Sequence, residues 1–191
     1  TPNWDMSKTH LIEKTPANVI RTRFLQSLLP ESAFVGILRH PGTIIAAFHA
    51  RNWPASKYHP TYLIEHWIRC HEYLYEDLPY LEQVCLIRYE HLISDPTYYF
   101  DRLATWLGLA GSIRDIRPPE PVKDKHVDSW KQMLLDSPSM RHQLEGELED
   151  RVGKFGYDLL DPNASTHCTL PNDILTKNDE QCFSKQLYQE K

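Results

Sequence analysis

Apolar residues recur at helical spacing in four segments of the first half of the chain. Helices are therefore predicted over 16–29, 43–52, 62–78 and 96–107. The first begins where Thr15 precedes a proline, a pattern typical of an N-cap and a first helical position. The last lies between Asp95, a good N-cap, and Gly108, which favours the end of a helix.

Two short apolar blocks lie between these helical segments. Residues 33–38 and 84–87 carry apolar side chains without alternation, as in strands buried on both faces of a parallel sheet. Because helices and strands alternate, the sequence predicts an α/β domain, in which ligands bind beyond the carboxyl ends of the strands. Arg39 and Tyr89 stand at those two ends.

The second half of the chain is more polar. Residues 112–128 contain three prolines and are predicted to form a loop, and 140–155 is predicted to be a charged helix. Residues 161–191 show no sustained periodicity and are expected to form a loosely ordered tail. The expected organisation is a domain over 1–160 followed by this tail.

Composition and charge narrow the class of protein. The 191 residues, 41% hydrophobic and 25% charged, fit one globular domain with a sizeable core. The net charge is −5 and the pI is near 6.0, so the chain lacks the overall positive charge that attracts most nucleic-acid-binding proteins to their ligand. No nucleic-acid partner is therefore expected. A local basic pocket is still compatible with this net charge. No apolar stretch approaches the roughly 18 residues of a membrane span, so membrane contact is expected only through a segment outside this sequence. The polar start without methionine leads us to expect a piece of a longer chain.

The cysteines lack the spacing of a metal or redox motif. Cys70 and Cys85 fall in apolar patterns and are predicted to lie in the core. His66, Cys70 and His71 place two metal-ligating side chains on one helix face. Cys70 also fits the apolar stripe of the predicted helix, and for this reason no metal site is expected.

Arg39 leaves a strand just before a Pro-Gly turn and a helix start. This order places its guanidinium beside backbone N–H groups and the positive end of a helix dipole, which is typical of a phosphate site. From this pattern alone, pairing of Arg39 with a surface carboxylate is an equally good interpretation.

Short motifs follow one another in a particular order along the chain. They are Glu13-Lys14-Thr15-Pro16, Leu38-Arg39-His40-Pro41, Arg88-Tyr89-Glu90-His91-Leu92 with Asp95-Pro96, Trp106-Leu107-Gly108-Leu109, Val127-Asp128-Ser129-Trp130-Lys131 and Phe155-Gly156-Tyr157. In this order and spacing the chain, over roughly residues 11–158, resembles PAPS-dependent sulfotransferases of the Golgi-type carbohydrate and tyrosylprotein branches. The resemblance implies a P-loop-like, three-layer fold with a parallel sheet flanked by helices, incomplete at its N-terminus. It also implies transfer of a sulfuryl group from 3′-phosphoadenylyl sulfate (PAPS) to a hydroxyl or amine of a carbohydrate or protein acceptor, without a metal.

The resemblance assigns five residues to the nucleotide. Arg39 matches the arginine that grips the 3′-phosphate, and Arg51 matches a second basic residue near that phosphate, with a solvated helix position as its alternative. Tyr89 matches a tyrosine beside the adenine. Lys123 and Lys125 fall where the late phosphate-contacting loop is expected, and spacing does not say which of them reaches the nucleotide.

One position departs from the family pattern. The family usually has a serine eight residues after the arginine, where this chain has Ala47, so one hydrogen bond worth about 1.5–3 kcal/mol is absent. Thr43 or the amides at the helix start are candidates to replace it. Glu90 is expected to brace the adjoining loop, and Trp130 is expected to pack.

Two residues near the start are candidate catalytic groups. Lys14 matches a lysine that lies near the acceptor, where an ammonium can stabilise developing charge. His10 is the candidate general base, although it lies 29 residues before Arg39, a longer spacing than in the branch that uses a histidine. The alternative that the resemblance implies is a glutamate upstream of this sequence, as in the branch that Glu13-Lys14 resembles. The glycine-containing loop that cradles the 5′-phosphosulfate in the family has no counterpart here, so the chain alone is expected to bind the donor poorly and to be inactive.

The compartment and the competing functions stay open at this stage. A Golgi lumen agrees with the sequon Asn163-Ala164-Ser165 and a Cys168–Cys182 bridge, and the cytoplasm is the alternative. A homodimer is compatible with the sequence. The alternative function is a non-catalytic nucleotide-binding or interaction module on the same fold, which Ala47 and the absent glycine loop favour. A nucleotide-kinase relative is disfavoured because no Walker A pattern is present.

Overall fold

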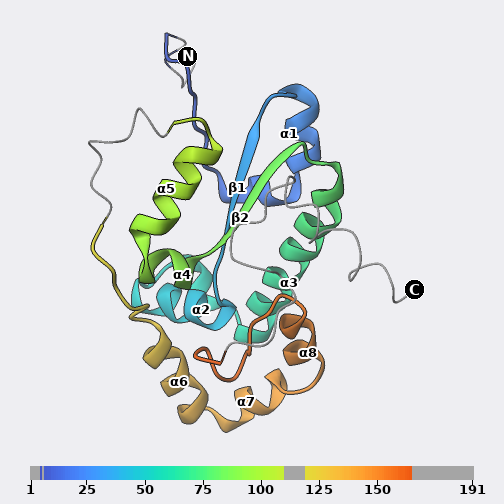
Figure 1. Cartoon of the computed structure of the whole chain (residues 1–191). Helices are drawn as coiled ribbons and strands as arrows, with labels where there is room; N and C mark the ends of the chain where they lie inside the picture. Colours follow the sequence, from blue (N-terminus) through green and yellow to red (C-terminus); the bar gives the residue numbers. More distant parts are fainter. Residues whose placement is uncertain (1–4, 6, 110–118, 165–191) are drawn as a thin grey trace.

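A parallel pair of strands forms the centre of the computed structural model, which describes residues 5, 7–109 and 119–164 (Figure 1). Strand β1 (Ala33–Leu38) pairs with β2 (Gln83–Arg88) in a register that sets Leu38 opposite Arg88. The crossover between the two strands carries α2 (Pro41–Ala50) and α3 (Pro60–Asp77), as a parallel connection requires. Both strands therefore finish at the same edge of the sheet, and the residues that follow them are neighbours there.

Helices pack on both faces of the sheet. On one face Val84 and Leu86 belong to the main core with Ile64, Ile68 and Leu74 of α3. On the other face Cys85 and Ile87 form a smaller cluster with residues of α4 (Tyr89–Ser94) and α5 (Pro96–Trp106). The predicted α/β class is confirmed as a mixed α/β fold with a two-stranded parallel sheet between helices.

Strand β1 differs from the prediction of burial on both faces. Val35 and Ile37 are 40% and 55% exposed, whereas β2 is buried from Val84 to Ile87. These two side chains lie on the face that α5 covers, and the apolar cluster there contains residues of β2 but none of β1. Among the described residues, one face of β1 is thus left open.

Three of the predicted helices are confirmed to within a few residues, and each begins at a proline. Helices α2, α3 and α5 start at Pro41, Pro60 and Pro96, and the preceding His40, His59 and Asp95 each accept a hydrogen bond from a backbone N–H of the first turn. The proline fixes the backbone for the first turn and the cap accepts one of the N–H groups left without a helical partner. Because both signals are local, the sequence shows them.

The single helix predicted over 16–29 is wrong. The chain forms a 3-10 helix, η1 (Pro16–Ile20), and then α1 (Thr22–Leu28), because Arg21 between them has φ −148° and ψ 27°. This break lets the buried Thr22 hydroxyl donate to Asp77 at the end of α3, at 2.6 Å. Thr15 does not cap the helix, since its hydroxyl donates to Glu13 instead.

The helix predicted over 140–155 is also wrong as one element. Gly146 has φ 81°, which ends one helix and separates α7 (Pro138–Leu144) from α8 (Glu147–Gly153). Helix α6 (Val127–Asp136) was not predicted, and it begins inside the loop expected over 112–128. Residues 119–126, the described part of that segment before α6, do form a loop. Short 3-10 helices η2 (Pro54–Lys57) and η3 (Leu78–Tyr80) complete the elements.

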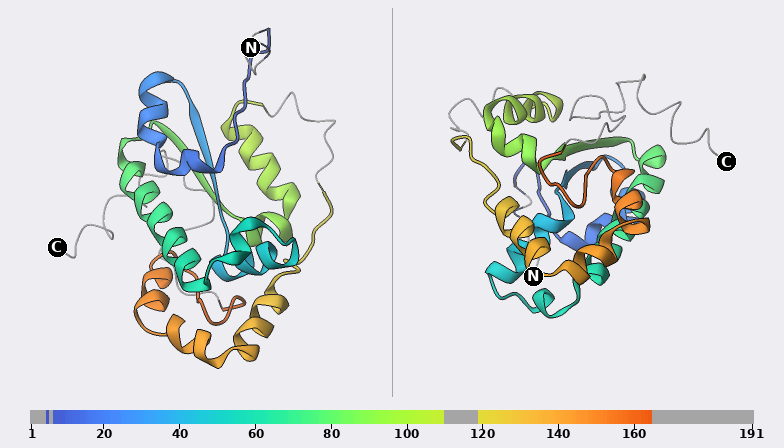
Figure 2. Two further views of the ribbon diagram at one scale, coloured as in Figure 1. Left: turned by 180° about the vertical axis from the view of Figure 1, so that it is seen from behind. Right: turned by 90° about the horizontal axis from the view of Figure 1, so that it is seen from below.

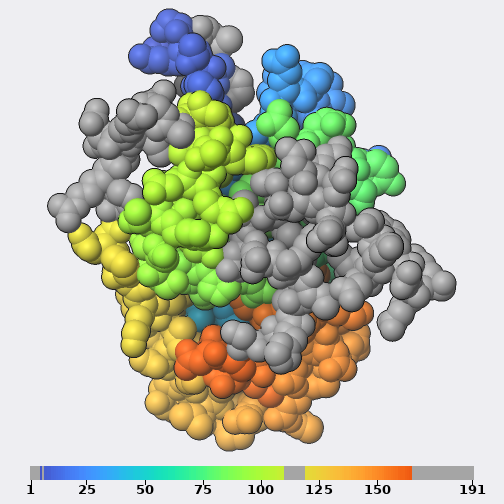
Figure 3. All heavy atoms as spheres, in the orientation of Figure 1, coloured from blue at the N-terminus to red at the C-terminus, as the bar shows by residue number. Residues whose placement is uncertain are grey.

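Helices α6, α7 and α8 surround the end of the molecule at which the strands finish (Figure 2). In Figure 3 they form the yellow-to-orange lower part, below the yellow-green α5. Most of the predicted tail, 165–191, lies outside the described residues, as do Cys168 and Cys182. No helix in the described ranges has the length and apolarity to cross a membrane.

Candidate functional site

A cavity of about 540 Å³ opens beside α2 at the carboxyl ends of the two strands. Its lining comes from three places: the residues after β1 and β2, one face of α2 with the turn that follows it, and the segment 122–126. The lining residues are Arg39, Ile44, Ala47, Phe48, Arg51, Trp53, Tyr89, Val122, Lys123, Asp124, Lys125 and His126. This is the position at which the fold class predicts a ligand.

Arg39 enters the cavity directly from the end of β1. Its Nε donates to Asp124 Oδ2 at 2.9 Å and its Nη2 donates to Oδ1 at 2.7 Å, which makes a two-point ion pair. The guanidinium carbon lies 4.5 Å from the centre of the Tyr89 ring. Arg39 therefore pairs with a carboxylate, as the alternative interpretation of the sequence proposed. The carboxylate is not at the surface, however, because the Asp124 side chain is only 4% exposed. Nη1 of Arg39 has no hydrogen-bond partner among the described residues.

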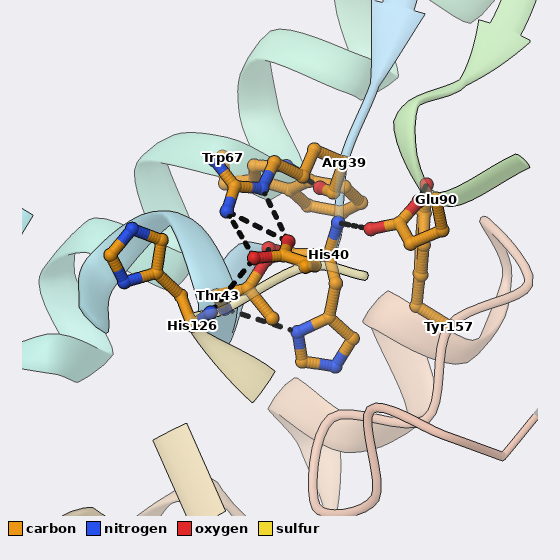
Figure 4. A network of polar contacts seen from close by, with 8 residues as sticks. Arg39, His40, Thr43, Trp67, Glu90, His126 and Tyr157 are labelled. Carbon is orange, nitrogen blue, oxygen red and sulfur yellow. Dashed lines mark hydrogen bonds and ion pairs between the residues drawn. The ribbon is translucent and has the colours of Figure 1, made fainter. Parts of the chain in front are cut away.

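Side chains of Glu90 and Trp67 hold the backbone at this strand end (Figure 4). Glu90 Oε1 accepts from the His40 backbone N–H at 2.8 Å, and Glu90 Oε2 accepts from the Tyr157 hydroxyl at 3.2 Å. Trp67 Nε1 donates to the Arg39 carbonyl oxygen at 3.1 Å. The prediction that Glu90 braces the adjoining loop is confirmed, and the strand end is a fixed platform for the Arg39 side chain.

His40 lies behind this platform and is 1% exposed. Its Nδ1 accepts from the Thr43 backbone N–H, and its Nε2 donates to the Asp158 carbonyl oxygen at 2.8 Å. Burial lowers the pKa of His40 to about 4, so the ring is neutral at pH 7. Thr43 is fully buried, and its hydroxyl donates to the His40 carbonyl oxygen. The structure gives no support for Thr43 as the replacement for the serine missing at position 47, because Thr43 is not part of the cavity lining and its hydroxyl is bonded to the backbone.

Helix α2 lines the cavity with residues at helical spacing. Ile44, Ala47, Phe48 and Arg51 share one face, and Trp53 stacks on Phe48 with the ring centres 5.5 Å apart. Asn52, with φ 48°, makes the reversal between them, and the Arg51 guanidinium carbon lies 5.6 Å from the Trp53 ring centre. Sequence reasoning missed Phe48 and Trp53. The helical spacing from Ile44 to Arg51 could have indicated Phe48, whereas no local signal pointed to Trp53.

The segment 122–126 contributes two lysines and a histidine. Lys123 and Lys125 are exposed and flank Asp124. The pKa of His126 is lowered, first by burial and then by the positive charge of Arg39. The structure thus brings together all five residues predicted for the nucleotide, namely Arg39, Arg51, Tyr89, Lys123 and Lys125.

Lys14 and His10 are not part of this cavity lining. Both are exposed in the segment before η1, where His10 Nδ1 lies 3.0 Å from the Thr9 hydroxyl. Their assignment as catalytic groups remains a prediction.

Five other residues singled out in the sequence lie outside the cavity lining. Trp130 is fully buried and donates through Nε1 to the Leu159 carbonyl oxygen at 2.9 Å, which confirms that it packs. His66 Nε2 lies 3.6 Å from Cys70 Sγ, but the His71 ring stacks on Trp67 with the ring centres 3.7 Å apart. Over the described ranges no group of three or more His, Cys, Asp or Glu side chains is arranged to hold a metal ion. Cys85 is fully buried, whereas Cys70 is only partly so.

Comparison with known proteins adds one finding. The family model described as "Sulfotransferase family" matches residues 3–112, more than half of the chain, and this stretch includes Arg39, Arg51 and Tyr89 of the cavity. No curated protein and no solved structure matches. On the strength of the family match, this chain belongs to the sulfotransferase family.

Proposed function

We propose that the cavity binds PAPS and that the chain is the part of a sulfotransferase that holds the 3′-phosphate and adenine of this donor. One observation carries the proposal. The five residues that the family resemblance assigns to the nucleotide come from separate segments of the chain and line a single cavity of about 540 Å³. Residues that only resembled the family by chance would have no reason to meet there.

The charge of the cavity supports an anionic ligand. Arg39, Arg51, Lys123 and Lys125 surround it, against the single carboxylate of Asp124. Guanidinium groups bind phosphate through two parallel hydrogen bonds, and ammonium groups add charge without a fixed geometry. Since the net charge of the whole chain is −5, this excess of cations is a local property of the site.

The chemistry that follows is sulfuryl transfer to a hydroxyl or amine of a carbohydrate or protein acceptor. The acceptor atom attacks sulfur, the bond from sulfur to the bridging phosphate oxygen breaks, and the proton of the acceptor passes to a base. Adenosine 3′,5′-bisphosphate leaves. The residues of this cavity orient the donor, and such positioning supplies much of the catalysis in group transfer. Lys14 is proposed to stabilise charge near the acceptor, and His10 is the candidate base.

The open face of β1 supports a second part of the proposal. Val35 and Ile37 are large apolar residues of a parallel strand, a setting in which both faces are normally covered. We propose that a helix of the complete protein covers this face, and that the strand before it, with the glycine-containing loop for the 5′-phosphosulfate, extends the sheet beside β1. Residence in the Golgi lumen, association as a homodimer and any membrane anchor belong to that complete protein and are proposed with it.

Ala47 favours a second candidate function, a nucleotide-binding module without catalysis. Its methyl group lines the cavity where the family usually has a serine hydroxyl for the 3′-phosphate. Such a module would bind adenosine 3′,5′-bisphosphate and transfer nothing.

A transfer assay separates the two candidates. The complete protein is incubated with radiolabelled PAPS and a set of glycan and protein acceptors, beside the Arg39→Ala variant. The enzyme proposal predicts labelled acceptor with the wild type and a strong reduction with Arg39→Ala. Binding of the bisphosphate without transfer to any acceptor would establish the non-catalytic module instead.

A further inference from the structure

We propose that Asp124 is a positioning residue, which orients the Arg39 guanidinium and holds Lys123 and Lys125 at the cavity, so that the site selects a phosphate by geometry as well as by charge. This inference rests on the proposed function. Asp124 has no counterpart among the residues that the family resemblance assigned, and it is the one carboxylate in the cavity lining.

The ion pair leaves a defined part of Arg39 for a ligand. A guanidinium has two edges that can each make two parallel hydrogen bonds. Asp124 occupies the edge formed by Nε and Nη2, with distances of 2.9 and 2.7 Å. The Tyr89 ring lies 4.5 Å from the guanidinium carbon and covers one face. The edge formed by Nη1 and the second N–H of Nη2 is what remains for a phosphate.

Asp124 also fixes the segment that carries the two lysines. Its Oδ1 accepts from the His126 backbone N–H at 2.9 Å, and its carbonyl oxygen accepts from Val127 N–H, the first residue of α6, at 3.2 Å. A carboxylate at the start of a helix is stabilised by the helix dipole. At the other end, the Val122 N–H donates to the Ile93 carbonyl oxygen of α4 at 2.8 Å. The segment 122–126 is thus attached on both sides, with Asp124 as its inner contact.

The charge of Asp124 indicates selection rather than simple attraction. A negative side chain 4% exposed beside the central arginine weakens the pull of the cavity on any anion. This unfavourable charge has a physical role if the carboxylate holds the Arg39 guanidinium in one orientation. Removal of this charge should therefore strengthen binding of a small, undirected anion and weaken binding of a ligand that must meet Arg39 in one geometry.

The test compares affinities in the wild type and in Asp124→Asn. Asn has the same shape but only one side-chain acceptor, so it cannot form the two-point pair. Calorimetry gives Kd for adenosine 3′,5′-bisphosphate, adenosine 5′-monophosphate and inorganic pyrophosphate. We expect the preference for the bisphosphate over the monophosphate to fall about tenfold, while pyrophosphate binds equally or more tightly. Asp124→Glu, which keeps both acceptors, should restore part of the preference and covers the case in which the Asn variant does not fold.

The matched control is Asp161→Asn. It removes the carboxylate that pairs with Lys131 at 2.9 Å, outside the cavity lining, and the preference should stay at the wild-type value. A second readout needs no ligand, since trypsin should cleave after Lys123 and Lys125 faster in Asp124→Asn than in the control.

The outcomes separate the two proposals. If folded Asp124→Asn keeps the wild-type preference, Asp124 does not position Arg39 and this inference is overturned, while the nucleotide site stands. If the wild type itself binds the bisphosphate no more tightly than the monophosphate, the proposed function fails, and the role of Asp124 fails with it.

Discussion

The indole Nε1 of Trp67 donates a hydrogen bond to the carbonyl oxygen of Arg39 at 3.1 Å. Trp67 belongs to α3 and is 7% exposed, with its ring stacked on His71 and edge-on to Tyr157 at 5.9 Å. The residue that faces the cavity is therefore tied through its backbone to the main core. The position of the Arg39 backbone thus depends on the packing of α3 in the main core.

Trp67→Phe is expected to lower the free energy of unfolding by about 1–3 kcal/mol. The smaller ring leaves the Arg39 carbonyl oxygen without its donor, and a buried polar group without a partner is destabilising by that amount. Urea denaturation followed by circular dichroism measures the change. Trp53→Phe, at a ring that is 47% exposed, is the control and should lose less. Equal losses in the two variants would contradict the importance of the hydrogen bond.

Gly42→Ala is expected to destabilise the protein by about 1–3 kcal/mol through overpacking. A Cβ atom on Gly42 would lie 2.3 Å from Cε2 of Trp130, whose ring is fully buried and cannot move aside. Gly153→Ala in α8 is the matched control, since a Cβ there meets nothing within 4 Å. Its thermal midpoint should be unchanged or higher, because alanine favours a helix over glycine. A wild-type midpoint for Gly42→Ala would contradict the close packing of α2 against Trp130 of α6.

Acid is expected to destabilise the fold through His40. Its pKa is about 4 in the folded protein and near 6.5 in the unfolded chain. The contribution of His40 to the free energy of unfolding is therefore fully present above pH 6.5 and is lost as the pH drops towards 4. The loss from this residue reaches about 3 kcal/mol once the pH is below 4. His40→Asn keeps a capping side chain for α2 but removes the titration. Denaturation at several pH values should give a shallower slope for this variant, and identical slopes would refute the assignment.

Ala47→Ser is expected to tighten binding of adenosine 3′,5′-bisphosphate about tenfold. Ala47 lines the cavity, and a hydroxyl at this position of α2 would add one hydrogen bond to a charged phosphate. Calorimetry on the wild type and the variant measures the ratio of the two Kd values. Ala46→Ser, on a neighbouring position outside the cavity lining, is the control. No gain, or weaker binding, would place the 3′-phosphate elsewhere in the cavity.

Local signals account for the elements that the sequence predicted well. The apolar blocks became β1 and β2, and the prolines at 41, 60 and 96 mark the starts of α2, α3 and α5. The breaks at Arg21 and Gly146 were missed because the apolar pattern continues through them. The hydrogen bond from Thr22 to Asp77, which goes with the first break, joins residues 55 positions apart.

The candidate site was predictable only where a residue belongs to a motif. Arg39 and Tyr89 follow apolar blocks in a family-like order, and their presence in one cavity agrees with that order. Asp124 pairs with a residue 85 positions away, and no spacing rule connects the two. Trp53 follows Asn52, which has a positive φ; asparagine tolerates this conformation better than most residues but does not by itself predict it. These contacts are products of the tertiary fold.

The most direct test of the account is calorimetry on this chain with adenosine 3′,5′-bisphosphate and adenosine 5′-monophosphate, in the wild type, Arg39→Ala and Arg69→Ala. Arg69 pairs with Glu65 on the surface of α3, outside the cavity lining, and serves as the matched control. The account predicts tighter binding of the bisphosphate, a loss of one to two orders of magnitude with Arg39→Ala, or about 1.5–3 kcal/mol, and no change with Arg69→Ala. Equal affinity for the two nucleotides, or an unchanged Kd in folded Arg39→Ala, would contradict a 3′-phosphate site at the end of β1.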